Sequence, residues 1–248
     1  MKAAGLTDVG VTRSQNQDAI HVSETAIGPL PNLFIVADGM GGHKAGDVAS
    51  NLAITEFCKF IINFPAKEFV LPENYLDLLV NAAQHANGKI TKKAQTDETM
   101  NGMGTTLTAC VIAAGKIFGV HIGDSRAYTI NVNGMKQLTT DHTFVHELMQ
   151  TGRVSEEEAK THPKRHILTK VLGASGFLEA DGIVHELGDA AAVLLCSDGL
   201  YNMVSDETIM KTVNGFGDAK HRIKYLIDEA NRNGGKDNIS AVLIDIDD

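Results

Sequence analysis

The chain has 248 residues, a length that one large α/β or all-β domain can reach, so we expect a single domain over residues 1–248. Apolar residues make up 43% and charged residues 21%, a composition that argues against long disordered segments. The net charge of −9 argues against a nucleic-acid-binding protein, because such proteins present a cationic surface.

The first hundred residues predict a buried strand followed by two helices. Residues 33–37 are a short, bounded apolar run that is typical of a buried strand, and the glycine-rich turn 38–42 follows it. Apolar residues then recur at helical spacing over 48–61. Pro72 opens a second helix, whose apolar face extends to Ile90.

Between residues 104 and 140 the pattern changes to β-strands. Strands are predicted over 105–112, 116–122 and 127–132. The dipeptide Asn133-Gly134 follows the third strand, and Asn-Gly favours a tight hairpin because both residues accept positive φ. We therefore expect antiparallel strand pairs in this region.

A small helical insert is predicted over about residues 141–165. Ser155 and Glu158 have the spacing of a capping box, and Gly152 suits the C-terminus of a helix. The last third predicts, in order, a strand, two helices and a strand: residues 191–196, a helix from about 205, a helix through 223–230, and residues 239–246. Because the hairpins imply antiparallel pairing, we expect an α+β fold rather than a parallel sheet.

The sequence also predicts the compartment. The longest apolar stretches, 33–37 and 190–196, are far shorter than the roughly 18 residues that cross a bilayer, and the N-terminus lacks the apolar segment of a signal peptide. Cys58, Cys110 and Cys196 lie singly in apolar segments, as reduced core cysteines do. We expect a cytoplasmic protein that does not bind a membrane.

Five aspartates stand where predicted strands meet turns: Asp18, Asp38, Asp124, Asp198 and Asp237. One aspartate beside glycine or asparagine is ordinary turn chemistry, but five such junctions favour a common site. Carboxylates that converge cannot all stay ionised unless cations lie between them. An all-oxygen ligand set favours Mg²⁺ or Mn²⁺ over Zn²⁺.

Six motifs occur in an order and spacing that resemble the bacterial type 2C metal-dependent serine/threonine protein phosphatases. They are Arg13-x-x-Asn16-Gln17-Asp18, Val36-Ala-Asp38-Gly39-Met-Gly-Gly42-His43, Gly104-Thr105-Thr106, Gly123-Asp124-Ser125-Arg126, Ser197-Asp198-Gly199-Leu200 and Gly235-Lys-Asp237-Asn238. The resemblance covers roughly residues 5 to 246. It implies a central sandwich of two antiparallel β-sheets flanked by helices on both faces, with the insert as a flap beside the active site.

The resemblance also implies a ligand set for two core metals, Mn²⁺ or Mg²⁺. Asp38 matches the residue that bridges both ions, Asp198 and Asp237 match the further ligands of the first, and the carbonyl of Gly39 matches a ligand of the second. Asp18 matches a residue that acts mainly through metal-bound water.

Three further positions follow from the same resemblance. Asp124, with Asp198, matches the residues that hold a third, weaker metal, and Arg13 matches the arginine that binds the substrate phosphate. Many eukaryotic relatives place a histidine two residues after the bridging aspartate, but Met40 occupies that position here. The proton donor for the leaving oxygen is therefore open between His43 and a metal-bound water.

The implied activity is hydrolysis of phosphoserine and phosphothreonine in proteins by direct attack of a metal-activated water. The implied partners are phosphoproteins made by a serine/threonine kinase, and a monomer is expected. Two alternatives compete with this hypothesis: a phosphoprotein-binding protein that has lost catalysis, and a hydrolase of small phosphate esters or nucleotides. The first predicts missing metal ligands, whereas all five aspartates are present.

Four histidines in and beside the insert allow another interpretation. His142 and His146 are four residues apart, as are His162 and His166, and this spacing on a helix is one that chelates metals. The alternative, which we prefer, is that they are surface or packing residues of the flap.

Overall fold

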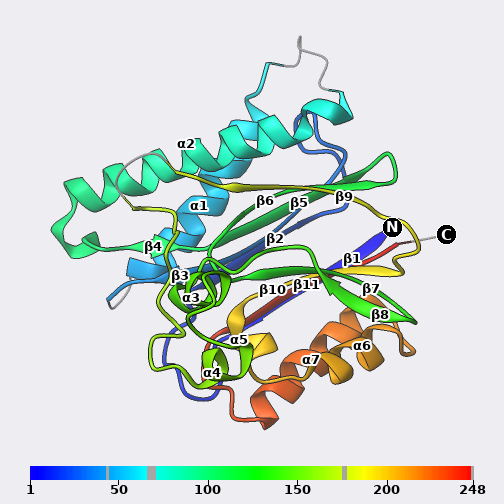
Figure 1. Cartoon of the computed structure of the whole chain (residues 1–248). Helices are drawn as coiled ribbons and strands as arrows, with labels where there is room; N and C mark the ends of the chain where they lie inside the picture. The colour runs from blue at the N-terminus through cyan, green and yellow to red at the C-terminus, as the bar shows by residue number, and fades with distance from the viewer. Residues whose placement is uncertain (43–44, 66–70, 175–177, 247–248) are drawn as a thin grey trace.

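Two antiparallel β-sheets pack face to face, and helices cover both outer faces (Figure 1). The computed structural model describes residues 1–42, 45–65, 71–174 and 178–246. The α-β-β-α sandwich expected from the resemblance is confirmed.

The first sheet has the strand order β1-β11-β10-β7-β8. Its strands are β1 (Lys2–Asp8), β7 (Arg126–Asn131), β8 (Gly134–Gln137), β10 (Ala192–Cys196) and β11 (Ile239–Asp245). The second sheet has the order β2-β3-β5-β6-β9, with β4 paired to β3. Its strands are β2 (Asp18–Ser23), β3 (Leu33–Met40), β4 (Gly104–Thr105), β5 (Leu107–Ala113), β6 (Lys116–Ile122) and β9 (Asp181–Glu186).

Two helices cover each sheet on its outer face (Figure 1). The second sheet carries α1 (Ala45–Ile62) and α2 (Tyr75–Thr96), and the first carries α6 (Asp206–Val213) and α7 (Ala219–Arg232). The shorter helices are η1 (Pro72–Asn74), η2 (Glu98–Met100), α3 (Phe144–Gln150), α4 (Glu156–Thr161) and α5 (Asp198–Tyr201). None of the helices in the described ranges is long and apolar enough to cross a membrane.

The continuous apolar run in β3 reflects burial on both of its faces. Successive strand residues point to opposite sides of a sheet. Phe34 and Val36 lie in the apolar cluster between the sheets, whereas Leu33, Ile35 and Ala37 join the cluster beneath α1 and α2. Both faces of β3 are therefore buried over residues 33–37, directly before Asp38.

The β7–β8 hairpin was predicted, but its expected turn is wrong. The two-residue loop is Val132-Asn133, and Gly134 already pairs with Asn131 in the ladder. Asn131 Oδ1 accepts the backbone N–H groups of Asn133 (2.8 Å) and Gly134 (3.0 Å), so a side chain closes this turn. Neither loop residue has positive φ.

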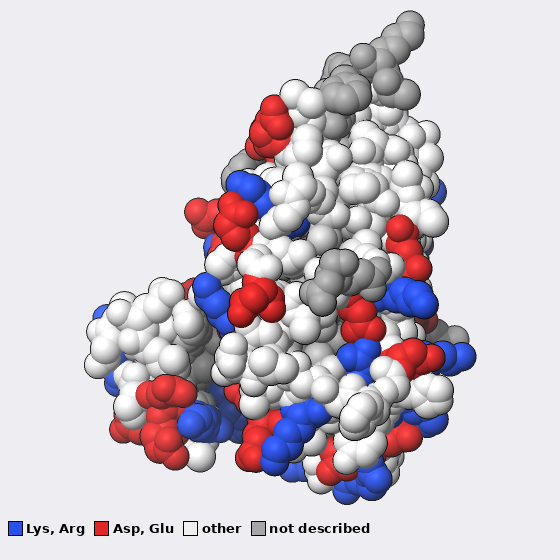
Figure 2. Space-filling view, turned by 90° about the vertical axis from the view of Figure 1, so that its right-hand side faces the viewer, with Lys and Arg blue, Asp and Glu red and all other residues white. Residues whose placement is uncertain are grey.

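The predicted insert contains α3 and α4, and its local signals are confirmed. Ser155 and Glu158 form the reciprocal bonds of a capping box at the start of α4. Gly152 has φ of +68° just beyond the end of α3. Over the face on the right-hand side of Figure 1, acidic and basic side chains are interspersed (Figure 2).

Candidate active site

The five aspartates meet at one end of the sandwich because each stands at the end of a strand. Asp18 and Asp38 are direct partners in the β2–β3 register. Asp124 lies in the turn between β6 and β7, Asp198 begins α5 directly after β10, and Asp237 precedes β11. Asp38, Asp124, Asp198 and Asp237 line one cleft of about 770 Å³, and Asp18, which pairs with Asp38 in the strand register, is buried with 6% of its surface exposed.

Asp38 is fixed by the break between β4 and β5. The strand predicted over 105–112 is interrupted at Thr106, whose hydroxyl accepts the Asp38 N–H (2.9 Å). The Thr106 N–H donates to the Asp38 carbonyl at 2.9 Å. Thr106 therefore pairs with both backbone groups of Asp38, and it does so only because it has left the strand ladder.

Gly39 sits where no side chain fits. A Cβ at this position would overlap the carbonyl oxygens of Gly46 and Gln17. The close approach of α1 to the end of β3 therefore requires glycine here.

Asp18 is held by a buried serine. The Ser197 hydroxyl donates to Asp18 Oδ2 at 2.8 Å and accepts the Ser240 N–H at 3.0 Å. Asp18 Oδ1 is buried and has no partner among the described residues. A buried carboxylate oxygen without a partner is costly, so this one fits a cation or an ordered water.

Burial and mutual repulsion raise the pKa values of these carboxyls. Burial is the main cause in each case, and it raises the pKa of Asp18 and of Asp124 to about 6. Burial, followed by the charges of Asp124 and Asp237, raises the pKa of Asp198 to about 8. The pKa of Asp38 is raised well above its usual value by burial and then by Asp18. Full ionisation of this cluster therefore requires positive charge.

The donor set fits hard divalent cations. In the described parts of the chain, no three acidic, histidine or cysteine side chains are already arranged around one point as metal ligands. Asp237 instead pairs with Arg13 at 2.8 Å, and Asp18 bonds to Ser197. The oxygen-only chemistry, the partnerless Asp18 Oδ1 and the raised pKa values nevertheless match the demands of Mg²⁺ or Mn²⁺.

Arg13 reaches the cleft from the loop between β1 and β2. Its side chain is 52% exposed, and Nη2 donates to Asp237 Oδ2. Asn238 shapes this loop, because its Nδ2 donates to the carbonyls of Val9 and Gln15 (both 2.9 Å) and its Oδ1 accepts the Gln17 N–H (2.8 Å). The residue directly before β11 thus shapes the loop that carries Arg13.

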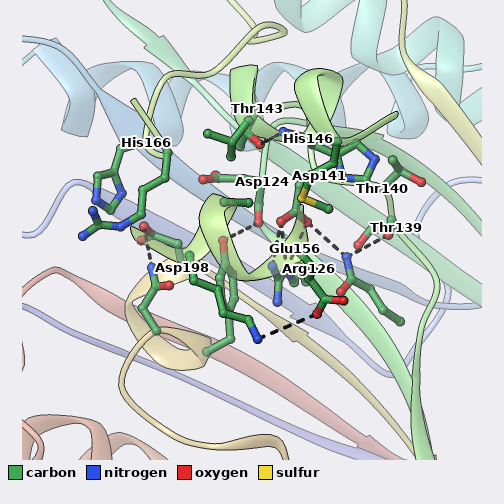
Figure 3. A pocket seen from close by; sticks show the side chains of 18 of the residues that line it. Asp124, Arg126, Thr139, Thr140, Asp141, Thr143, His146, Glu156, His166 and Asp198 are labelled. Atoms are coloured by element: carbon green, nitrogen blue, oxygen red, sulfur yellow. Dashed lines mark hydrogen bonds and ion pairs between the residues drawn. The ribbon is translucent and has the colours of Figure 1, made fainter. Parts of the chain in front are cut away.

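The flap borders the cleft and encloses a second cavity of about 740 Å³ (Figure 3). Arg126 binds Asp141 through Nε (3.0 Å) and Nη2 (2.7 Å), and its guanidinium lies 3.7 Å from the centre of the Tyr201 ring. The Tyr201 hydroxyl donates to the Asp124 carbonyl at 3.1 Å. His166 lines both cavities.

A family model described as protein phosphatase 2C matches residues 11–243. The chain belongs to the protein phosphatase 2C family. The expectation from the six motifs is confirmed at the level of the family.

Relatives of this phosphatase have matching names. The serine/threonine phosphatase stp of Listeria monocytogenes serovar 1/2a is 37% identical, over 100% of this chain and 96% of the relative. PstP of Mycobacterium tuberculosis, a serine/threonine protein phosphatase, is 36% identical over 100% of this chain and 45% of its own length. This phosphatase is therefore a hydrolase that acts on phosphoserine or phosphothreonine in proteins.

Solved structures agree on the fold. Stp1 from Staphylococcus aureus, a serine/threonine phosphatase, superposes with a TM-score of 0.91 at 33% identity, covering 100% of this chain and 95% of that one. The catalytic domain of PstP in complex with two manganese ions gives a TM-score of 0.83 at 34% identity, covering 100% and 98%.

The other site predictions for this phosphatase have mixed outcomes. Met40 lines the cleft and is 41% exposed, as its position in the motif suggests. His43 lies outside the described residues. The chelating alternative for the histidine pairs is wrong, because His142 precedes α3, and His162 and His166 both follow the end of α4. Neither pair shares one helix.

Sequence reasoning assigned no role to Ser197 or Asn238, although both lie inside the motifs that it used. Their contacts cross between segments far apart in the chain, from Ser197 to Asp18 and from Asn238 to the loop that carries Arg13. The sequence did contain one signal for these roles: each is a short polar residue directly beside a predicted metal ligand, Asp198 or Asp237.

We expect the metal-free phosphatase to lose stability as the pH rises from 6.5 to 8. Asp198 has a folded-state pKa of about 8 against an ordinary 3.8, so the folded state holds more protons than the unfolded state in this window. The stabilisation present at low pH is therefore lost as the pH rises through the folded pKa. The comparison starts at 6.5 because burial lowers the pKa of His121 to about 4, and that histidine has its own effect at lower pH.

Mn²⁺ should offset this loss by neutralising the cluster, so the metal-induced increase in Tm should be larger at pH 8 than at pH 6.5. At a hundredfold excess over Kd, a ligand that binds only the folded state adds about 2.7 kcal/mol. Thermal unfolding with chelator and with Mn²⁺ at both pH values measures the effect. Equal increases at the two pH values would contradict the charge argument.

Proposed function

We propose that this phosphatase works as a single domain over residues 1–248, in which divalent metals held by the aspartate cluster activate a water for direct attack on phosphorus. The observation that carries the proposal is the convergence of four aspartates on one cleft, with the buried Asp18 paired to Asp38 beside it. Burial and mutual repulsion raise the pKa of four of these five carboxyls, and the fifth, Asp237, pairs with Arg13. Bound Mn²⁺ or Mg²⁺ would lower the pKa of the attacking water and offset the charge of the phosphate oxygens.

The proposed ligands follow the motif positions. Asp38 would bridge the two core ions, Asp198 and Asp237 would complete the first, the Gly39 carbonyl would bind the second, and Asp18 would act mainly through water. The buried, partnerless Oδ1 of Asp18 supports a polar occupant at that point. The two manganese ions named for the PstP structure support the number of core ions.

Two further assignments are part of the proposal. Asp124 would help to hold a third, weaker metal with Asp198, and the charge of Asp124 is among the causes that raise the Asp198 pKa, which supports their proximity. The proton donor to the leaving serine or threonine oxygen is proposed to be either His43 or a water bound to the third metal. The side chain of Met40, two residues after Asp38, cannot serve this purpose because a thioether carries no acidic proton.

Arg13 is proposed to bind the substrate phosphate with its guanidinium, which would turn from Asp237 towards the phosphate oxygens. Replacing Arg13 with Ala should raise KM for a phosphopeptide more than it lowers kcat, if the contact is equally strong in the ground and transition states. Loss of one charged hydrogen-bonding group costs roughly 1.5 to 3 kcal/mol, or about 10- to 150-fold in kcat/KM.

Steady-state kinetics on one phosphothreonine peptide would measure this change, with Arg13→Lys as the variant that keeps the charge but loses the planar fork. If Arg13→Ala had the kinetic constants of the wild type, the phosphate-binding role would be wrong.

The remaining parts of the proposal concern context. The substrates would be phosphoproteins made by a serine/threonine kinase, and the enzyme would be a cytoplasmic monomer that binds neither nucleic acid nor membrane. Three free cysteines suit a reducing compartment. The net charge of −9 and the mixed charges in Figure 2 support the absence of nucleic-acid binding.

The test is dephosphorylation of phosphoserine and phosphothreonine peptides by metal-stripped protein, with and without added Mn²⁺ or Mg²⁺. We expect activity only with metal, and its loss on addition of chelator. Nucleotides and sugar phosphates serve as competitors, because a small-ester hydrolase would turn these over faster than peptides. Full activity after exhaustive metal removal would overturn the metal mechanism, and binding of phosphopeptide without turnover would favour a catalytically inactive relative.

A further inference from the structure

The turn that carries Asp124 is short and closely packed. Gly123 joins the end of β6 to Asp124 with φ of +105°, and a Cβ at Gly123 would lie 2.5 Å from Thr106 Cγ2. Thr106 is the residue that binds the Asp38 backbone. A small displacement of Gly123 would therefore move Asp124 relative to Asp38.

His142 holds both backbone groups of Gly123. The His142 N–H donates to the Gly123 carbonyl at 2.8 Å, and His142 Nδ1 accepts the Gly123 N–H at 3.0 Å. The side chain thus acts as a hydrogen-bond acceptor for a buried amide that has no other partner among the described residues. Without this acceptor, the Gly123 N–H would be left unpaired in a buried site, which costs roughly 1 to 3 kcal/mol.

The surroundings of His142 set its tautomer. An imidazole that accepts at Nδ1 must carry its proton on Nε2 when it is neutral. His142 Nε2 lies 3.1 Å from Asp181 Oδ2, off the line of a hydrogen bond, so this contact is electrostatic. Lys170 Nζ binds the other oxygen of Asp181 at 3.1 Å. Burial lowers the pKa of His142, although Asp181 opposes the shift, which agrees with a neutral ring.

A second histidine fixes the plane of the ring. His121 is fully buried and stacks on His142 with 4.9 Å between ring centres and 25° between planes. His121 Nε2 lies 3.0 Å from the Thr140 carbonyl, and its Nδ1 lies 2.9 Å from Thr108 Oγ1. The His142 carbonyl also accepts the Thr169 N–H at 2.9 Å. His142, at the start of the flap, therefore binds both the Gly123–Asp124 turn and Thr169, which follows the flap.

We propose that His142 is a positioning residue, which holds the Gly123–Asp124 turn through its Nδ1 acceptor and so places the Asp124 carboxylate relative to Asp38 and Asp198. The inference rests on the proposed role of Asp124 as a metal ligand. His142 touches neither substrate nor metal in this scheme. Asp181 assists by favouring the tautomer that leaves Nδ1 free to accept.

Two isosteric substitutions separate this role from simple packing. The amide oxygen of asparagine can occupy the position of Nδ1, whereas glutamine reaches the position of Nε2 and offers no acceptor near Gly123. His142→Gln should therefore lose the Gly123 hydrogen bond, and His142→Asn should keep it. His221→Gln, at an exposed histidine on α7, is the matched control.

The primary measurement is calorimetric titration with Mn²⁺ of the wild type, both His142 variants and Asp124→Ala. Loss of a residue that orients a metal ligand typically weakens metal affinity or activity by about 10- to 100-fold. We expect His142→Gln to weaken, by that factor, the same Mn²⁺ binding event that Asp124→Ala removes, and to lower kcat in parallel. His142→Asn should change the affinity by no more than a few-fold. Hydrogen exchange of the Gly123 amide should be fast only in His142→Gln.

The outcomes are distinguishable. If Asp124→Ala weakens one Mn²⁺ site and His142→Gln does not, the positioning role is wrong while the proposed function stands. If both His142 variants lose Mn²⁺ affinity equally, and the loss follows the decrease in their Tm, His142 contributes only to packing. If Asp124→Ala changes no Mn²⁺ binding event, the proposed role of Asp124 is wrong, and the inference about His142 is overturned with it.

Discussion

Asp38→Asn is expected to abolish phosphopeptide turnover without unfolding the protein. The substitution keeps the shape of the side chain, and the two hydrogen bonds to Thr106 use the backbone of residue 38 and are unaffected. It removes the charge that both core cations are proposed to share. Losing the charge stabilisation that metals supply costs several kcal/mol, or at least about 10³-fold in kcat.

The stability of this variant provides an independent check. Asp38 is partly buried, and burial, followed by repulsion from Asp18 and Asp198, raises its pKa. A neutral asparagine removes this repulsion, so the chelated variant should melt at or above the Tm of the chelated wild type. Added Mn²⁺ should then raise its Tm much less than it raises that of the wild type.

Asp228→Asn on α7 is the matched control, because this half-exposed aspartate pairs only with Lys224 in the described residues. It should leave both kcat and the Mn²⁺ effect on Tm unchanged. If Asp38→Asn were active and Mn²⁺ raised its Tm as much as that of the wild type, the proposed bridging role of Asp38 would be wrong.

Asp124→Ala is expected to fail in a different way. If Asp124 helps to hold only the third metal, the variant should still bind two Mn²⁺ ions and retain most of the metal-induced stabilisation. Its kcat should fall by roughly 10²- to 10⁴-fold, the range typical of a lost acid–base contribution to the departure of the leaving oxygen. The side chain is 9% exposed, and burial raises its pKa, so its removal should not destabilise the chelated protein through lost charge pairing.

Metal stoichiometry by calorimetry and kcat on the same phosphopeptide together test this expectation. Asp189→Ala, at an exposed loop residue on a different surface, controls for the loss of one acidic side chain. Wild-type kcat in Asp124→Ala would make the third metal dispensable and leave Asp124 as a turn residue.

Local patterns were sufficient to predict most of the layers. The apolar run over 33–37 and the helical periodicity over 48–61 are patterns within a single segment. The first corresponds to β3 and the second to α1. The capping box at Ser155 is likewise a contact between neighbours in the chain. Such features depend on few residues, so sequence reasoning can find them.

Two strands, β1 and β9, were not predicted, because long-range contacts rather than a local pattern define them. In β1, Gly5 interrupts the strand pattern, but a Cβ there would lie within 2.8 Å of Val22 and Ile20, so glycine permits the two sheets to approach. In β9, Val184 is 53% exposed at a sheet edge, and pairing with β6 rather than an alternating pattern defines the strand. The prediction of the β7–β8 turn was wrong for a related reason. The side chain of Asn131 closes the turn, whereas the prediction assumed a turn made by backbone geometry at Asn133-Gly134.

The same distinction holds at the site. The strand-end aspartates could be found because each occupies a recognisable junction in the sequence. The residues that orient them could not, because Ser197 reaches Asp18 across 179 positions and Asn238 reaches Val9 across 229. Their roles depend on the order of the strands, which no single segment encodes.

The placement of β11 has a consequence for how the protein is made. This strand is the last of the described strands, yet it lies between β1 and β10, and Asp237 and Asn238 directly precede it. A nascent chain that has not yet released residues 237–245 from the ribosome lacks one proposed metal ligand and the side chain that shapes the Arg13 loop. Its first strand also has no neighbour to pair with in its sheet. We therefore expect phosphatase activity to appear only after residues 237–245 have left the ribosome, so that shorter nascent chains do not act on the phosphoproteins of the cell.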